Sequence, residues 1–147
     1  MSIRLTALRG VASRTVNLRG EAVTVRPTAS AVLDAVYALY PPPLAPLIHN
    51  PDAGSLAPKI PDERDPAYVA AKLAWSRKTD CIEAAIVMDV AVDGLGTRGE
   101  AGPERLRAWC ELAAAEAGSV LTREEVRAVL LAAKEAAEDG IREARGN

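Results

Sequence analysis

The chain has 147 residues, of which 49% are hydrophobic and only 3% aromatic, and its formal net charge is −2. This length fits a single domain (1–147) with a hydrophobic core, and the many alanines favour closely packed helices. No apolar run approaches the roughly 18 residues that a membrane span requires, and the first ten residues, MSIRLTALRG, lack the apolar core of a signal peptide. We therefore expect a protein that stays in the cytoplasm where it is made and has no membrane partner.

Residues 2–26 predict short strands. The segments 15–18 (TVNL) and 21–25 (EAVTV) alternate apolar and polar residues on either side of Arg19 and Gly20. Gly20 supplies the positive φ of a tight hairpin turn, and a similar Arg-Gly pair ten residues earlier points to a three-stranded meander. A sheet this small has one apolar face, which it must bury against a helix.

The same segment is basic. Residues 1–30 hold five arginines, at positions 4, 9, 14, 19 and 26, against Glu21, so the remaining 117 residues sum to −6. An arginine-rich head could bind nucleic acid or an acidic partner. The even spacing, one arginine per strand or turn, instead favours solvent-facing positions of the strands. An isoelectric point near 5.5 and the lack of aromatic residues in this segment also argue against nucleic acid as a partner.

A short helix is predicted over 28–40. Thr28 or Ser30 can cap it, and the prolines at 41–43 end it. Apolar residues surround nearly its whole circumference, so one small sheet cannot cover it, and we expect its other side to meet a partner or a second copy. The predicted partner-binding residues are Val32, Val36, Tyr37, Leu39 and Tyr40. Complete burial inside the monomer is the alternative.

Residues 41–64 hold seven of the ten prolines and predict a long irregular connection. A polyproline-binding domain could recognise such a segment, but no basic residues flank the prolines closely. We expect the loop to cross the surface, pinned by Leu44, Leu47 and Ile48.

The stretch 65–92 predicts the longest helix and the spine of the domain. Asp65 can cap it, and Pro66 suits the first helical position. A helix of this length extends about 40 Å, so other elements can pack along it. Its apolar stripe, on which we expect Trp75 to be largely buried, comprises Tyr68, Ala71, Trp75, Ile82, Ala85 and Ile86.

Residues 103–145 predict a helical hairpin. The first helix covers 103–117 and ends at Gly118 in a left-handed conformation, with Leu106, Trp109, Cys110 and Ala113 on its apolar stripe. Thr122 and Glu125 form a capping box for the second helix. A link of roughly four residues makes the two helices antiparallel. The inward residues of the second helix are Val126, Val129, Leu130, Ala133, Ala137 and Ile141.

Gly94, Gly96 and Gly99 match the spacing G-x-G-x-x-G, which binds pyrophosphate in dinucleotide folds. Here no convincing second strand with a ribose-binding carboxylate follows. We expect a flexible turn between helices and no cofactor.

We find no catalytic or metal-binding constellation. Cys81 and Cys110 are isolated thiols that we expect to be buried and reduced, and the only histidine is His49. Acidic residues at 62–65 suit a helix start, while Asp89 and Asp93 have no histidine nearby. Because no nucleophile–base pair can be named, we expect no catalytic residue, no metal and no enzymatic activity.

Together these elements predict a mostly helical α+β domain. We expect a β-rich head (2–26) that forms a hairpin or a meander, followed by about four helices. These are the short helix 28–40, the long helix 65–92 after the proline-rich loop 41–64, and the two helices of the hairpin 103–145.

Three short motifs occur in a recognisable order: V-x-V-R-P at 23–27, Tyr-Pro-Pro at 40–43, and Asp-Pro-x-Tyr followed by a tryptophan at 65–75. With them the chain resembles the tail assembly chaperones of long-tailed bacteriophages and related gene transfer agents. The resemblance covers about the first two thirds of the chain. The segment from residue 103 onward carries no matching motif.

The resemblance implies a small, non-enzymatic protein of the host bacterial cytoplasm. It would coat the extended tape-measure protein and help to recruit tail-tube subunits, without being retained in the virion. A homo-oligomer is a further expectation. The alternatives are a structural component of the tail or neck of a phage-like particle, and a small nucleic-acid-binding module that uses the arginine-rich N-terminal strands.

Overall fold

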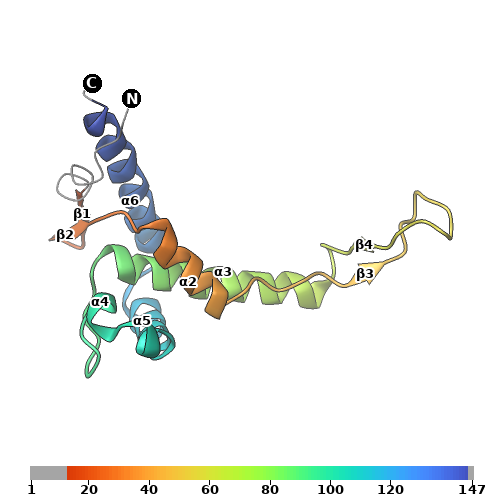
Figure 1. The fold of residues 1–147 in the computed structure, drawn as a ribbon, viewed down its shortest axis with the longest axis horizontal. Coiled ribbons are helices and arrows are strands. Elements are labelled where there is room, and N and C mark those ends of the chain that lie inside the picture. Colours follow the sequence, from red (N-terminus) through yellow and green to blue (C-terminus); the bar gives the residue numbers. More distant parts are fainter. Residues whose placement is uncertain (1–12, 146–147) are drawn as a thin grey trace.

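The computed structural model of the protein describes residues 13–145, and it confirms a mostly helical α+β fold that begins with a small β-hairpin (Figure 1). The strands are β1 (Arg14–Leu18), β2 (Glu21–Val25), β3 (Leu47–Ile48) and β4 (Ile60–Pro61). The helices are α2 (Ser30–Leu39), α3 (Pro66–Val87), α4 (Arg98–Ala101), α5 (Leu106–Val120) and α6 (Arg123–Ala144), with a 3-10 turn at Pro103–Arg105.

The N-terminal hairpin forms where the sequence predicts it. β1 and β2 pair antiparallel with Val16 opposite Val23, which places their apolar side chains on one face. Arg19 and Gly20 both have positive φ, 54° and 89°, as a tight two-residue hairpin turn requires. The Gly20 N–H donates to Asn17 Oδ1 at 2.8 Å. The additional strand of the predicted meander lies outside the described residues.

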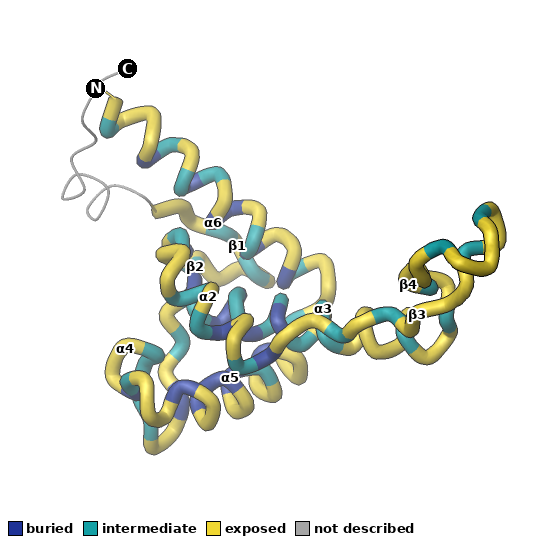
Figure 2. The backbone as a smooth tube through the Cα atoms, turned by 45° about the vertical axis from the view of Figure 1, so that its right-hand side comes forward, coloured by how far each residue is buried: buried dark blue, intermediate teal, exposed yellow. Residues whose placement is uncertain are grey.

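Helix α3 is the spine, but only its C-terminal half is buried (Figure 2). On one side, Ile82 and Ala85 pack with Trp109 of α5 and Val36 of α2. On the other side, Ala84 and Val87 pack with Val25 of β2 and with Val126 and Val129 of α6. The domain therefore has two core clusters, which share this one stretch of helix.

The predicted end of this helix at residue 92 is wrong, because the helix ends at Val87. Asp89 adopts a left-handed conformation with φ 56°. Its N–H donates to the carbonyl of Ile86, and the N–H of Val90 donates to the carbonyl of Ala85, both at 3.0 Å. This is the hydrogen-bond pattern of a Schellman motif, with aspartate where glycine is usual.

Helix α2 spans Ser30–Leu39, close to the predicted 28–40. Neither expected cap is used, because Ala29 occupies the N-cap position and no side chain caps the helix. Thr28 Oγ1 is buried without a hydrogen-bond partner among the described residues.

The two C-terminal helices pack on α3 rather than on each other. Helix α5 continues through Gly118 to Val120, so the predicted stop at that glycine is wrong. Leu121 is extended, and Thr122 at once caps α6 with the expected box, since Glu125 N–H donates to Thr122 Oγ1 at 3.2 Å. So tight a link turns α6 away from α5 and across α3, as Figure 1 shows.

Along α6 the predicted inward residues Val126, Val129 and Ala133 are buried, whereas Ile141 is exposed. The hairpin also contacts the later part of this helix, where Arg14 of β1 pairs with Glu135 and Asp139. Ala136 and Gly140 in the same part are buried as well.

The fully buried tryptophan is Trp109, not Trp75. The ring of Trp109 is 0% exposed, and its Nε1 donates to the carbonyl of Gly96 at 3.1 Å. Trp75 is only half-buried, because it lies where α3 leaves the body of the domain.

We predict that Trp109→Ala lowers the free energy of unfolding by about 3–5 kcal/mol, because it opens a cavity in the core. Trp75→Ala should cost about 1–2 kcal/mol, since part of its ring already meets solvent. Urea unfolding followed by circular dichroism measures both. Equal losses would contradict the assignment of Trp109 to the core.

Candidate functional site

An arm formed by residues 41–65 projects from the body and leads into the start of α3 (Figure 1). Its two limbs pair through β3 and β4, with Leu47 opposite Pro61, and the Asp62 N–H donates to the Pro46 carbonyl at 2.7 Å. The seven prolines keep the limbs extended and remove hydrogen-bond donors, which limits β pairing to two residues on each side. The predicted irregular connection is thus a narrow hairpin.

Large apolar side chains on the arm face solvent. Leu56 at the tip is 100% exposed and Leu44 is 91% exposed, and Leu47, Ile48 and Ile60 are also exposed. The expectation that Leu44, Leu47 and Ile48 pin the segment to the surface is wrong. The pairing of the limbs carries them away from the body, and Figure 2 shows the arm mostly in the exposed colour, with some intermediate residues and none buried.

The first part of α3, residues 66–74, extends beyond the body in the same direction as the arm; we call it the overhang. None of its residues is buried, and Val69 and Leu73 are each about half exposed. These two residues lie one turn apart on one face of the helix. The arm and the overhang together form the largest concentration of exposed apolar side chains in the described part of the chain.

A polar network fixes the base of the arm. The Nε1 of Trp75 donates to the carbonyl of Tyr40 at 2.7 Å, directly before the prolines. The hydroxyl of Tyr40 donates to Glu111 at 2.8 Å, and Lys78 donates to the same carboxylate at 2.7 Å. The ammonium of Lys78 also lies 4.8 Å from the centre of the Tyr40 ring, in cation–π geometry.

These contacts shift two pKa values in opposite directions. The hydrogen bonds from Lys78 and then Tyr40 hold the pKa of Glu111 below its ordinary value. Burial, followed by the hydrogen bond to Glu111, raises the pKa of Tyr40. The network therefore requires an ionised carboxylate and a neutral phenol, which is the normal state at neutral pH.

The predicted partner-binding residues of α2 separate into two groups. Val36 and Tyr40 are buried in the core with α3 and α5, and Val32 and Leu39 are half-buried. Only Tyr37 is exposed, at 38%, with its ring 6.0 Å from that of Trp75 at the base of the arm. A partner surface on this helix is therefore limited to Tyr37, and partner binding there stays a prediction.

The described arginines of the head are largely engaged within the domain. Arg14 pairs with Glu135 and Asp139 of α6, and Arg19 pairs with Glu125 and donates to the carbonyl of Val120. These pairs fasten the hairpin onto α6. Their guanidinium groups are consequently already matched by carboxylates, which weakens the case for a nucleic-acid surface.

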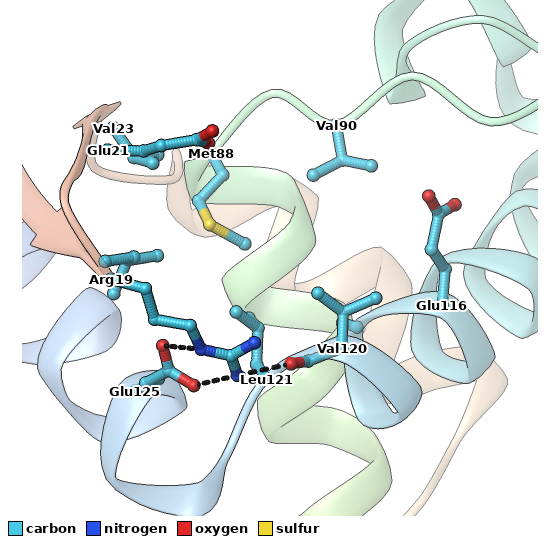
Figure 3. Close-up of a pocket in the computed structure, with 11 residues that line it drawn as sticks. Arg19, Glu21, Val23, Met88, Val90, Glu116, Val120, Leu121 and Glu125 are labelled. Atoms are coloured by element: carbon cyan, nitrogen blue, oxygen red, sulfur yellow. Dashed lines mark hydrogen bonds and ion pairs between the residues drawn. The ribbon is translucent and has the colours of Figure 1, made fainter.

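A cavity of about 510 Å³ lies beneath the hairpin turn (Figure 3). Its apolar wall includes Met88, Val90 and Val120, and the ion pair between Arg19 and Glu125 closes one side. Its polar lining consists of Arg19 and of the carboxylates of Glu21, Glu116 and Glu125.

Among residues 13–145, no group of three or more His, Cys, Asp or Glu side chains is placed to hold a metal ion. Cys110 is buried and Cys81 half-buried, and both are free thiols. Burial raises the pKa of Cys110 to about 11, so its thiol is protonated and unreactive at neutral pH. None of the described helices has the length and apolar character needed to cross a membrane.

The glycine motif forms an ordered loop instead of a flexible turn. Val92 and Gly96 form a β-bridge, and Thr97 caps the short helix α4. Gly96 has φ 67°, and a Cβ atom built there would lie 2.2 Å from Glu100 Oε2. The positive φ of Gly94 and Gly96 shapes this surface loop, which covers Trp109 of the core.

Comparisons of the chain with protein-family models, with curated proteins and with solved structures found no match.

We predict that Tyr40→Phe raises the pKa of Glu111 toward its ordinary value, because the carboxylate loses one hydrogen-bond donor. A carboxylate with a lowered folded pKa stabilises the fold above its ordinary pKa, and this contribution disappears as pH falls through the lowered value. Because the Glu111 pKa is higher in Tyr40→Phe, this stabilising contribution should disappear at a higher pH than in the wild type. NMR titration of the Glu111 carboxyl carbon measures the shift. Tyr68→Phe is the control, and an unchanged Glu111 pKa in Tyr40→Phe would refute the network.

We also predict that NAD, ATP and GTP give no binding heat in calorimetry, because Gly94 and Gly96 shape a loop that packs on Trp109. Micromolar binding that is lost in Gly96→Val would overturn this account of the glycine motif.

Proposed function

We propose that this protein is a non-enzymatic tail assembly chaperone of a phage-like particle, which binds the tape-measure protein and helps to recruit tail-tube subunits. The proposal draws on the resemblance carried by residues 23–27, 40–43 and 65–75 and on the shape of the molecule. In this assignment the protein acts in the bacterial cytoplasm, where tails are assembled.

The observation that carries the proposal is the exposed apolar surface of the arm and the overhang. Soluble monomers rarely display so many large apolar side chains together unless another molecule covers them. Leu47, Leu56 and Leu73 come from two elements that project in the same direction. They suit a client that is long and apolar on one side, as a helical tape-measure segment is.

The three motifs that carry the resemblance also have structural roles here. Tyr40 and the prolines after it direct the chain into the arm, and Trp75 holds that exit through the Tyr40 carbonyl. Asp65 caps α3 by accepting the Tyr68 N–H at 2.9 Å, which fixes the return from the arm to the helix. These two motifs lie at the two ends of the arm, whereas the third, residues 23–27, packs on α3 through Val25 and through the Arg26 N–H, which donates to the Val87 carbonyl.

A structural component of the tail or neck would use the same exposed surface in a different way, because it would remain in the finished particle. A chaperone leaves before the particle is complete. Mass spectrometry of purified particles separates the two, since the proposal requires that this chain be missing from them.

The proposal requires that a neighbouring reading frame encode a long helical tape-measure protein, and the direct test is co-expression with that protein. We predict that the wild type keeps that protein soluble and co-purifies with it. Leu47→Glu combined with Leu56→Glu should weaken the complex about tenfold or more, because charged groups replace apolar anchors. Both residues face solvent, so the fold should be retained.

Leu131→Glu on α6 is the matched control, because Leu131 is also exposed but lies on the body. Full binding by the arm variant, or equal loss in the control, would refute the arm as the client-binding surface.

A further inference from the structure

A second cavity, of about 310 Å³, lies where the overhang meets the start of α6. Helix α3 contributes Leu73, Arg77 and Asp80 to its lining, and α6 contributes Arg123 and Arg127. The cavity therefore joins the exposed half of α3 to the body of the domain.

Positive charge dominates this cavity. Three arginines line it against one carboxylate, that of Asp80. Among the described residues, the ion pairs within 4 Å involve Arg14, Arg19, Lys78 and Arg142 and none of the three arginines of the cavity, although the charge of Arg127 favours the ionised form of Asp80.

An apolar stripe leads into this charged cavity. Val69, Leu73 and Arg77 follow one another at intervals of four residues, so they lie on one face of α3. Val69 and Leu73 are about half exposed, and Leu73 also lines the cavity. A ligand on this face meets two apolar side chains and then three guanidinium groups.

We propose that this surface docks an amphipathic helix of a protein partner whose apolar stripe is followed by aspartate or glutamate residues. The apolar side chains of the partner cover Val69 and Leu73, and its carboxylates pair with Arg77, Arg123 and Arg127. Guanidinium groups bind carboxylates through two parallel hydrogen bonds, which gives the contact direction as well as charge. A nucleic acid would satisfy the arginines but leave the two apolar residues uncovered.

This inference rests on the proposed function and adds the chemistry of the client: an acidic helix, docked in a fixed direction along α3. Electrostatic attraction would speed the encounter and exclude basic segments. The arm then binds the apolar side of the client beyond the overhang.

The test is a selection from a displayed library of helical peptides with two leucines four residues apart and a randomised following turn. The full-length protein is the bait. We expect aspartate and glutamate to be enriched in the randomised turn. The Arg123→Glu, Arg127→Glu double variant should enrich lysine and arginine instead, while the control Arg105→Glu should behave as the wild type.

Fluorescence anisotropy with the selected acidic peptide measures the dissociation constant of the wild type and of the variants. The double variant should weaken binding about tenfold or more, and higher salt should weaken the wild-type complex. Glutamate at the first position of α6 suits the helix dipole, so the variant should fold, and circular dichroism checks this.

No enrichment of acidic residues, or the same enrichment with the double variant, would overturn the inference. A change in oligomer size in the double variant alone would also overturn it, because the arginines would then bind a second copy of this chain. In either case, loss of the client in the Leu47→Glu, Leu56→Glu variant would still uphold the proposed function.

Discussion

The structure depends on the burial of one stretch of α3, residues 79–87, on two sides at once. Ile82 and Ala85 face α2 and α5, whereas Ala84 and Val87 face the hairpin and α6. The alanines allow neighbouring elements to approach closely on both sides, and β2 is tied directly to this stretch because the Arg26 N–H donates to the Val87 carbonyl at 2.9 Å. Removing this stretch would separate the two clusters, since α5 packs mainly on α3 and α6 packs on α3 and on the hairpin.

This arrangement explains why so much apolar surface is left uncovered. The neighbours of α3 all lie along its C-terminal half, so the first two turns and the arm have nothing to pack against within the described residues. Trp75, Tyr40 and Glu111 lie at the boundary and make hydrogen bonds instead of a dry core. Large apolar side chains therefore remain exposed on the arm and on the start of α3.

The sequence predicts the parts of the fold that local chemistry determines. Arg19-Gly20 between alternating strands, Asp65-Pro66 before α3 and the Thr122–Glu125 capping box all form as expected. The prediction fails where contacts between distant parts of the chain determine the helix ends and the helix packing. Asp89 ends α3 without a glycine, Gly118 stays helical, and α5 and α6 do not pack on each other. The hairpin of the arm is not predicted, because the proline content indicates an irregular loop. Leu47-Ile48 and Ile60 nevertheless flank a turn-rich segment, which is typical of a hairpin.

The central claim of the proposal is that the client binds along the arm and the overhang and meets the body only at the start of α6. Hydrogen–deuterium exchange, measured on the protein alone and in complex with the tape-measure protein, tests this claim most directly. We expect slower exchange in residues 44–62 and 66–74 on binding, and unchanged exchange in α5 and in β1–β2. Slower exchange confined to the body, with the arm unaffected, would contradict the account.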